Sequence, residues 1–598
     1  MIRTHLPSAA RGFPRLLLLL RRLLPVLLAP LLLTASLSAC VGMPDTGPVV
    51  DIDPQAQDGS RAGTFYDPRP PAVGSSSREI VNGFLEAMKA TPIRTSVAKQ
   101  FLSSRARARW RPERATVTYT DLEAPVGERS VSLGVLGAQR YDSRGAWERK
   151  LDEQESRLSF PMVREGDEWR IDEAPDALLV PASWFEERFV RASLQFLDPT
   201  GSILVPEPVF VPAGDQFATA LVSGLLLGPP EELGQVTRSA VPPGLRLATS
   251  SVPITADGLA EVALAGAGEE FDAVSEEMAA QLAWTLRQEP RVRAVQVTLD
   301  GRRLPLPGGV SEIPREAGAR FDPDALGASE EIFALRDGLL VRGRTDELEA
   351  TAGPLGVEGA GLVSAAVNLR GTVAAGVSRS GSVSVAPLSD PGGAVTEVVA
   401  GATDLLPPAW DFVDRLWLVD RPAAGARVSV AVGTKVRTVV VPGLTGTRVK
   451  AFQVSRDGSR LVAVVRGARR DRLVVSRVLH GSAGRILRAT PAREIELDVE
   501  PGFRITDIGW RSATSVSVLS ALAGDVSQVR TVAVDGAPGE LADAGALRIP
   551  GRASALVSSP EEGASPYVVG KAGVTDLLDP GRRLPALEAG VTSIGYVG

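Results

Sequence analysis

The sequence predicts a multidomain protein in which two small α+β domains precede an all-β domain, a C-terminal β-propeller. The chain has 598 residues, enough for three or four domains, and its 44% apolar and 23% charged residues are typical of globular proteins. Up to about residue 308, apolar residues with helical spacing alternate with strand-like runs. From about residue 321 the helical spacing disappears, and short β-branched runs recur between Gly, Asp and Ser turns.

The first 40 residues have the pattern of a lipoprotein export signal. Five arginines and no acidic residue precede or interrupt an apolar run that ends shortly before Leu-Ser-Ala-Cys, at Cys40. Prolines break this run, which suits a signal better than a permanent membrane span. The alternative is an ordinary secretory signal with a chance cysteine. Cys40 is the single cysteine, however, and it stands where a lipobox has its acylated residue.

Resemblance to a lipobox implies cleavage after Ala39, so that residues 1–39 are the signal peptide. It also implies an S-diacylglycerol group on Cys40 and an acyl group on the new amino terminus. Two or three acyl chains make a stable anchor, which predicts a protein held by lipid on the extracytoplasmic face of the cell membrane.

Composition excludes several classes of function. After cleavage the one remaining histidine is His480, which we expect on an exposed loop, so a multi-histidine zinc site cannot form and a catalytic triad has one candidate base. A single cysteine forms no intramolecular disulfide. Cleavage removes five positive charges and changes the formal net charge from -6 to -11, which disfavours nucleic-acid binding. We therefore expect no enzyme, no cofactor and no metal site.

Residues 40–76 are predicted to be the lipidated cysteine and a disordered tether rich in Pro, Gly and Asp. As a flexible coil, this segment reaches roughly 30 to 35 Å from the membrane. The first folded domain is predicted at 77–188. Ile80, Val81, Phe84, Leu85 and Met88 predict one helix, and Val97, Phe101 and Trp110 suggest a second.

Strand-like segments follow these helices, and one hairpin is expected at Glu165-Gly166-Asp167. Two helices before a curved antiparallel sheet resemble the nuclear-transport-factor-like α+β fold. Such a sheet can hold a ligand in its concavity, but a packed spacer domain is the interpretation that we favour.

The second domain is predicted at 190–308, with the element order βαββαβ. A helix at 217–227 ends at Gly228-Pro229-Pro230, and a later helical stripe runs from Phe271 to Leu286. The segments Leu226-Leu227-Gly228-Pro229, Val241-Pro242-Pro243-Gly244, Trp284-Thr285-Leu286 and Val297-Thr298-Leu299-Asp300-Gly301 resemble a GerMN domain. The acid pairs Glu269-Glu270 and Glu276-Glu277 are interpreted as a solvated helix edge rather than as catalytic carboxylates.

After a linker at 309–320, residues 321–598 are predicted to form the propeller. Turns that precede strands recur at spacings of 43, 44, 56 and 49 residues, at Gly371, Asp414, Gly458, Thr514 and Gly563. A second strand begins about a dozen residues after each turn, a period typical of propeller blades. Asp337-Gly338 is a candidate turn of an earlier, degenerate blade. Trp410 and Trp510 are expected in the core, and a β-sandwich with fortuitous spacing is the alternative fold.

One basic cluster stands out in the predicted propeller. It consists of Arg466, Arg469, Arg470 and Arg472, and Asp471 interrupts it. A solvated hairpin loop is the ordinary interpretation, and contact with anionic lipid or an acidic partner is the other.

Together these features resemble the LpqB family of actinobacterial lipoproteins. The resemblance is strongest at 79–85, at Phe196-Leu197-Asp198-Pro199, at Leu204-Val205-Pro206 and in the GerMN-like core. It implies a non-catalytic accessory that meets the extracytoplasmic domain of the sensor histidine kinase of an MtrAB-type two-component system, and thereby affects the cell envelope and division. The family pattern carries over only one site residue, the lipidated Cys40.

Two alternatives remain at this point. One is an envelope scaffold that binds peptidoglycan or another cell-wall polymer through the GerMN-like domain or the propeller. The other is a propeller hydrolase that works with carboxylates, against which stands the lack of a nucleophile motif, a P-loop or a metal-ligand cluster in the sequence.

Overall fold

The computed structural model describes residues 65–598 except 235, 267–270, 323–330, 358–360, 482, 498, 539–545, 562, 572 and 582. Residues 63–598 form one compact unit. The predicted signal peptide, Ala39, Cys40 and most of the tether lie outside the described residues, as do Glu269 and Glu270. In the described part of the chain, no helix combines the length and the hydropathy of a membrane span.

The first domain begins with helix α2 (Ser77–Ala87), as the apolar spacing predicts. Ser76 and Glu79 form a capping box at its start, and Ile80, Val81 and Phe84 are fully buried on its inner face. The second predicted helix is divided into η2 (Ala98–Phe101) and α3 (Ser104–Arg109), because Leu102 is extended and Ser103 caps a new helix.

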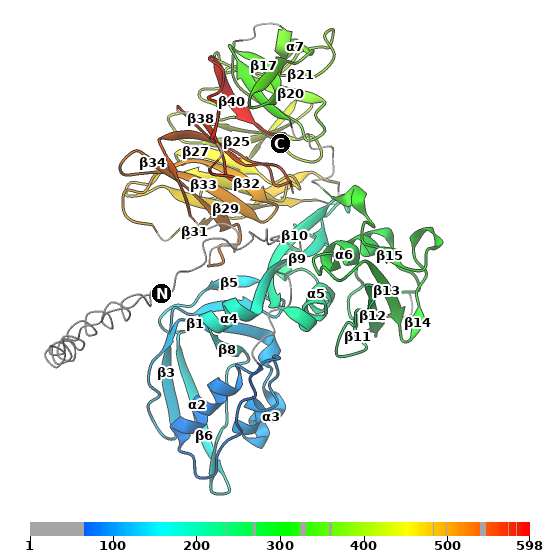
Figure 1. Cartoon of the computed structure of the whole chain (residues 1–598), viewed down its shortest axis with the longest axis vertical. Helices are drawn as coiled ribbons and strands as arrows, with labels where there is room; N and C mark the ends of the chain where they lie inside the picture. Colours follow the sequence, from blue (N-terminus) through cyan, green and yellow to red (C-terminus); the bar gives the residue numbers. More distant parts are fainter. Residues whose placement is uncertain are drawn as a thin grey trace, which may run out of the picture. The chain divides into compact units, whose positions relative to one another are not determined.

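Two four-stranded sheets complete the first domain (Figure 1). Their orders are β5-β4-β1-β8 and β2-β3-β6-β7, and α4 (Ala182–Arg188) follows them. Their strands are β1 (Ala115–Tyr119), β2 (Asp121–Leu122), β3 (Ser130–Leu136), β4 (Gln139–Asp142), β5 (Trp147–Lys150), β6 (Arg157–Glu165), β7 (Glu168–Ile171) and β8 (Leu178–Pro181). The pair β1–β8 is parallel, which alternation of apolar residues does not predict. The hairpin expected at Gly166 joins β6 to β7.

The last part of the predicted tether packs on this domain. Tyr66 and Thr91 exchange two backbone hydrogen bonds, and the Gly74 N–H donates to the Glu168 carboxylate at 3.1 Å. Residues from Tyr66 onward therefore belong to the folded unit.

The GerMN-like domain contains the predicted order βαββαβ, with one additional strand before it and two short strands after it. Its elements are β9 (Phe189–Leu197), β10 (Leu204–Pro212), η4 (Gly214–Gln216), α5 (Phe217–Leu226), η5 (Glu231–Leu233), β11 (Arg246–Leu247), β12 (Leu259–Ala265), α6 (Glu276–Leu286), β13 (Ala294–Leu299), β14 (Arg302–Arg303), η6 (Pro307–Gly309), β15 (Ile313–Pro314) and η7 (Ala319–Phe321). Strands β9 and β10 form a long two-stranded hairpin, and the other strands form one sheet. Helix α6 begins after Ser275, so that Phe271 and Val274 precede it; Glu276 in its first turn is exposed and pairs with Arg320 at 2.7 Å.

The segment that the sequence predicts as a linker contributes to this domain. Strand β15 pairs with β13, and Phe321 is buried in the same apolar core.

The C-terminal domain is a propeller, and its described residues form six sheets, each of which is one blade. The first blade contains β16 (Ile332–Arg336), β17 (Leu339–Arg344), β18 (Glu347–Ala350) and β40 (Val591–Gly595), and α7 (Pro354–Val357) follows it. The second contains β19 (Leu362–Val367), β20 (Val373–Ser378), β21 (Val383–Pro387) and β22 (Thr396–Val399), and the third contains β23 (Ala409–Trp410), β24 (Leu416–Asp420), β25 (Arg427–Val432) and β26 (Lys435–Val439).

The fourth blade contains β27 (Val449–Val454), β28 (Arg460–Val465), β29 (Arg472–His480), β30 (Ile486–Ala489) and β31 (Arg493–Ile495). The fifth contains β32 (Ile505–Ser512), β33 (Ser515–Leu522), β34 (Val526–Ala533) and β35 (Leu547–Pro550), and the sixth contains β36 (Ala553–Val557), β37 (Tyr567–Gly570), β38 (Gly573–Asp576) and β39 (Arg583–Leu584). The five repeats found in the sequence correspond to the second and third strands of blades two to six. Asp337-Gly338 is the turn of the first blade, and Asp337 has φ of 54° there.

The ring is closed by its two ends. The C-terminal strand β40 (red in Figure 1) pairs antiparallel with β16 of the first blade. Trp410 and Trp510 are buried on the innermost strands of their blades, as expected of core residues. Each indole N–H donates to a carbonyl on the innermost strand of the preceding blade, Ala366 at 3.2 Å and Val454 at 2.9 Å. These bonds join neighbouring blades around the axis.

Candidate functional site

The β9–β10 hairpin of the GerMN-like domain contacts one face of the propeller. The Arg460 guanidinium, 1% exposed, donates to the Pro206 carbonyl at 2.6 Å and lies 3.1 Å from the Glu207 carboxylate. Arg477 forms a second ion pair with Glu207. Because a buried charge is costly unless it is paired, this arrangement favours the docked state of the hairpin.

The loop at the tip of the hairpin is held in shape by hydrogen bonds to one carboxylate. The buried Asp198 carboxylate accepts hydrogen bonds from the backbone N–H groups of Thr200, Ser202 and Ile203 at 2.7 to 3.1 Å. This loop places Ile203, 2% exposed, in an apolar cluster of the propeller that includes Phe412 and Val597.

Further contacts extend the junction. Arg191 on β9 pairs with Asp535 of the fifth blade at 3.1 Å. Arg493 of the fourth blade donates to the Asp535 carbonyl and stacks over the ring of Trp147, a residue of the first domain, at 5.2 Å. All three domains therefore contact one another around this face, which we call the hairpin-bound face.

His480 lies at the same face, and the expectation that it occupies an exposed loop was wrong. It is the last residue of β29 and only 4% exposed, because the strand continues to it and pairs with β30. Burial lowers the pKa of His480 to about 4, and the nearby Arg415 adds to this effect. At neutral pH the imidazole is therefore uncharged, and its burial removes it from contact with a substrate in bulk solvent.

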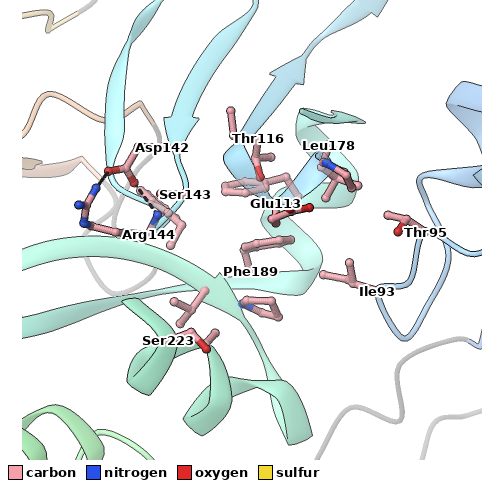
Figure 2. Close-up of a pocket in the computed structure, with 18 of the residues that line it drawn as sticks. Ile93, Thr95, Glu113, Thr116, Asp142, Ser143, Arg144, Leu178, Phe189 and Ser223 are labelled. Carbon is pink, nitrogen blue, oxygen red and sulfur yellow. Dashed lines mark hydrogen bonds and ion pairs between the residues drawn. The ribbon is translucent and has the colours of Figure 1, made fainter. Parts of the chain in front are cut away.

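A pocket of about 330 Å³ lies between the first domain and the GerMN-like domain (Figure 2). One wall is aromatic: Phe185 and Phe189 stack at 4.3 Å, and Phe210 lies 5.6 Å from Phe185. The lining also includes Asp142 and Arg144, which pair with each other at 2.9 Å (Figure 2). Arg144 also donates to the Gly228 carbonyl just after α5, and this hydrogen bond links the two domains. Arg94 and Glu113 also line the pocket, so its lining is partly charged.

In the described part of the chain, no group of three or more His, Cys, Asp or Glu side chains is placed to hold a metal ion. Glu276 and Glu277 lie in the first turn of α6, at the helix edge that the sequence predicts for them.

Sequence reasoning did not identify Glu207, Arg460 or Arg477. The one available signal was Glu207 itself, a lone acid in the apolar strand Leu204–Pro212. The segments at 196–199 and 204–206, which carry the family resemblance, are the ones that build this hairpin.

Comparison with known proteins supports the resemblance over most of the chain. Family models described as "Lipoprotein LpqB, N-terminal domain" and "Lipoprotein LpqB beta-propeller domain" match residues 70–186 and 338–579. The Germane model, described as "Sporulation and spore germination", matches residues 193–305 between them.

Similar proteins include Lipoprotein LpqB of Thermobifida fusca, 26% identical over 579 residues with 86% of this chain and 90% of that protein covered. Lipoprotein LpqB of Streptomyces coelicolor is 27% identical, with 86% and 88% covered. Lipoprotein LpqB of Mycobacterium tuberculosis is also 27% identical, with 82% and 85% covered.

Among solved structures, the tandem GerMN domains of the sporulation protein GerM from Bacillus subtilis are 21% identical, with a TM-score of 0.18, and cover 21% of this chain and 47% of that chain. TolB from Acinetobacter baumannii is 11% identical, with a TM-score of 0.29, and covers 59% of this chain and 99% of that chain. With the LpqB models matching both end domains and LpqB relatives aligned along more than four-fifths of the sequence, the chain belongs to the LpqB family of lipoproteins.

Proposed function

We propose that the chain is a lipid-anchored protein of the extracytoplasmic membrane face that acts as a non-catalytic accessory of a sensor histidine kinase, of the MtrAB type. The observation that carries the proposal is the match of both end domains to LpqB models. Anchoring through Cys40, after cleavage behind Ala39, is part of the proposal. Modulation of envelope and division signalling would follow from contact with the extracytoplasmic domain of the kinase.

The structure supports a binding role in two ways. The one histidine of the described residues is buried at a domain junction, where it meets no substrate from solvent. The three domains are also joined around the hairpin-bound face, so a partner would meet a composite surface rather than one isolated module.

The test should use the complete protein. Cutting the chain between the GerMN-like domain and the propeller would expose Ile203 and separate Arg460 from Glu207. We therefore suggest photo-crosslinking of the lipidated, full-length protein in native membranes, with the crosslinker at exposed positions of each domain in turn. Crosslinks to the sensor domain from at least one domain are expected. Failure at every position, with the protein correctly anchored, would contradict the kinase partnership.

A second candidate function is an envelope scaffold that binds a cell-wall polymer through the GerMN-like domain or the propeller. The pocket beside Phe189 and Phe210 favours it, because it is a formed cavity at the edge of the GerMN-like domain. Pull-down of the full chain with isolated cell wall distinguishes the two candidate functions. If the protein is retained on the cell wall in the absence of the kinase, the scaffold function is supported.

A further inference from the structure

The two ends of strand β28 lie at opposite faces of the propeller. The strand begins at Arg460, which the GerMN hairpin covers, and ends at Val465. Six residues in a strand span about 20 Å, so the β28–β29 loop that starts at Arg466 lies far from the hairpin. We call the face that carries this loop the open face.

The open-face loop is the basic cluster that the sequence singles out. Its acid, Asp471, does not neutralise the cluster: its fully buried side chain binds Lys450 at 2.7 Å, Arg504 at 3.3 Å and the Ile505 N–H at 3.1 Å. These bonds fix the loop to the neighbouring blade. The loop is thus a supported structure rather than a freely solvated turn.

The remaining charges of the cluster divide into two groups. Arg470 and Arg472 face Glu494, at 3.1 and 3.8 Å. Arg466 and Arg469 are exposed, and neither side chain reaches a carboxylate within ion-pair distance in the described part of the chain. Two guanidinium groups therefore point into solvent from a rigid base.

Adjacent segments extend this surface. The Arg466 N–H donates to the Arg448 carbonyl at 2.8 Å, which places the exposed Arg448 beside the loop. The same connector carries Val440, which is 64% exposed. On the other side, the Gly502 N–H donates to the Arg469 carbonyl, and the described residues of this connector contribute two exposed acids, Glu496 and Glu500. Among the described residues of these segments, three exposed arginines face two exposed carboxylates, and Val440 adds an apolar side chain at the edge.

We infer that the open face, through Arg448, Arg466 and Arg469, docks on the anionic headgroups of a phospholipid membrane. Each basic side chain near an anionic bilayer contributes about 1 kcal/mol of attraction. At physiological ionic strength, charges further than about 8 Å are screened, so the acidic remainder of the protein does not cancel this local attraction.

The proposed Cys40 anchor would assist this contact but is not required for it. Attachment to the membrane raises the effective concentration of the face at the bilayer to about the millimolar range, so a weak affinity is sufficient. Docking in this way leaves the hairpin-bound face directed away from the lipid. The inference is independent of the kinase partnership.

Co-sedimentation with vesicles tests the inference. The unlipidated chain from residue 41 onward is mixed with vesicles of phosphatidylcholine alone, or with a two-to-one mixture of phosphatidylcholine and phosphatidylglycerol. Binding is expected only to the mixture and should weaken at high salt. The double variant R466E/R469E should lower the partition coefficient about tenfold or more. The control R302E/R437E changes the net charge equally at exposed arginines of β14 and β26, and should retain binding.

Three outcomes would overturn the inference. Equal binding to both vesicle types would show that charge is not recognised. Binding that R466E/R469E leaves unchanged would place the contact elsewhere. Binding to soluble poly(glycerol phosphate) without binding to vesicles would identify the occupant as a polymer rather than a membrane. Circular dichroism of both double variants verifies that they fold, and a further single variant, R448E, provides an independent measurement on the neighbouring connector.

Discussion

The Arg460 guanidinium and the Glu207 carboxylate lie 3.1 Å apart, although the two residues are 253 positions apart in the sequence and belong to different domains. Arg460 is 1% exposed, and the side chain of Glu207 is 11% exposed. The pair is accordingly shielded from solvent, unlike most ion pairs on a protein surface. Its removal should affect the junction between the GerMN-like domain and the propeller more than any local strand.

We expect Glu207→Gln to lower the free energy of unfolding by about 3 kcal/mol, because Arg477 then loses its carboxylate partner and Arg460 keeps only Asp457, at 3.5 Å. Denaturant unfolding of the full soluble chain measures the change. The matched control is Glu588→Gln, which removes an exposed pair with Arg336 and should cost less than about 1 kcal/mol. Equal effects of the two substitutions would mean that the junction does not depend on this cluster.

The buried His480 should make the protein sensitive to acid. Its pKa is about 4 in the folded state and about 6.5 when unfolded, so between these values the unfolded chain binds more protons. The stability that the uncharged His480 contributes is fully present above pH 6.5. It is lost as the pH falls to 4, which lowers the free energy of unfolding by up to about 3 kcal/mol. His480→Gln should remove it. The measurement is the free energy of unfolding against pH, and a variant that keeps the wild-type slope would refute the assignment.

The titration of Asp507 should make the free energy of unfolding fall as the pH rises, opposite to the effect of His480. Asp507 lies on the innermost strand β32 and accepts the Leu556 N–H of the next blade at 2.9 Å. Burial raises the pKa of Asp507 to about 6 from 3.8. Stability from this carboxyl is therefore greatest below pH 3.8 and is lost as the pH rises to 6, by about 3 kcal/mol.

Asp507→Asn should remove that loss and leave a stability that rises more steeply between pH 4 and 6 than in the wild type. The amide keeps one acceptor oxygen, so the slope and not the absolute stability is the informative quantity. Identical slopes in the variant and the wild type would show that Asp507 does not titrate in this range.

Removal of the last strand should open the propeller. Deletion of 591–598 eliminates β40, which closes the ring on β16, and also Val597, which belongs to the same apolar cluster as Ile203. Since blades are stabilised by stacking on their neighbours, the truncated protein should become sensitive to trypsin throughout the domain. A synthetic peptide of residues 588–598 added in trans should restore part of the protection. Unchanged digestion of the truncated protein would indicate independently stable sheets.

The lipid anchor is tested at Cys40. Cys40→Ser offers no thiolate for diacylglyceryl transfer, so the variant should move from the detergent phase to the aqueous phase in detergent-partitioning experiments. Cys40→Ala provides a second non-nucleophilic residue and should behave identically. A serine variant that remains in the detergent phase would contradict lipidation at this residue.

Local sequence was sufficient to predict the fold class, because periodicity reports which side of an element is buried. The apolar stripe of α2, the βαββαβ order and the repeated hairpins of blades two to six follow from spacing over a few residues. The lipobox pattern at Cys40 likewise depends only on neighbouring residues. The innermost and outermost strands of the blades were not predicted, and among them β23 and β39 are each two residues long, too short to have a detectable period.

Only the tertiary structure decided which charged residues are buried and which are exposed. Glu207 and Arg460 resemble surface residues in the sequence, and they become buried because a hairpin from one domain covers the end of a strand in another. Arg466 stands in the same blade, six residues after Arg460, yet remains exposed because it lies at the other end of β28. The cost of burying a charge is met by partners that are distant in sequence, and sequence spacing contains no information about such partners.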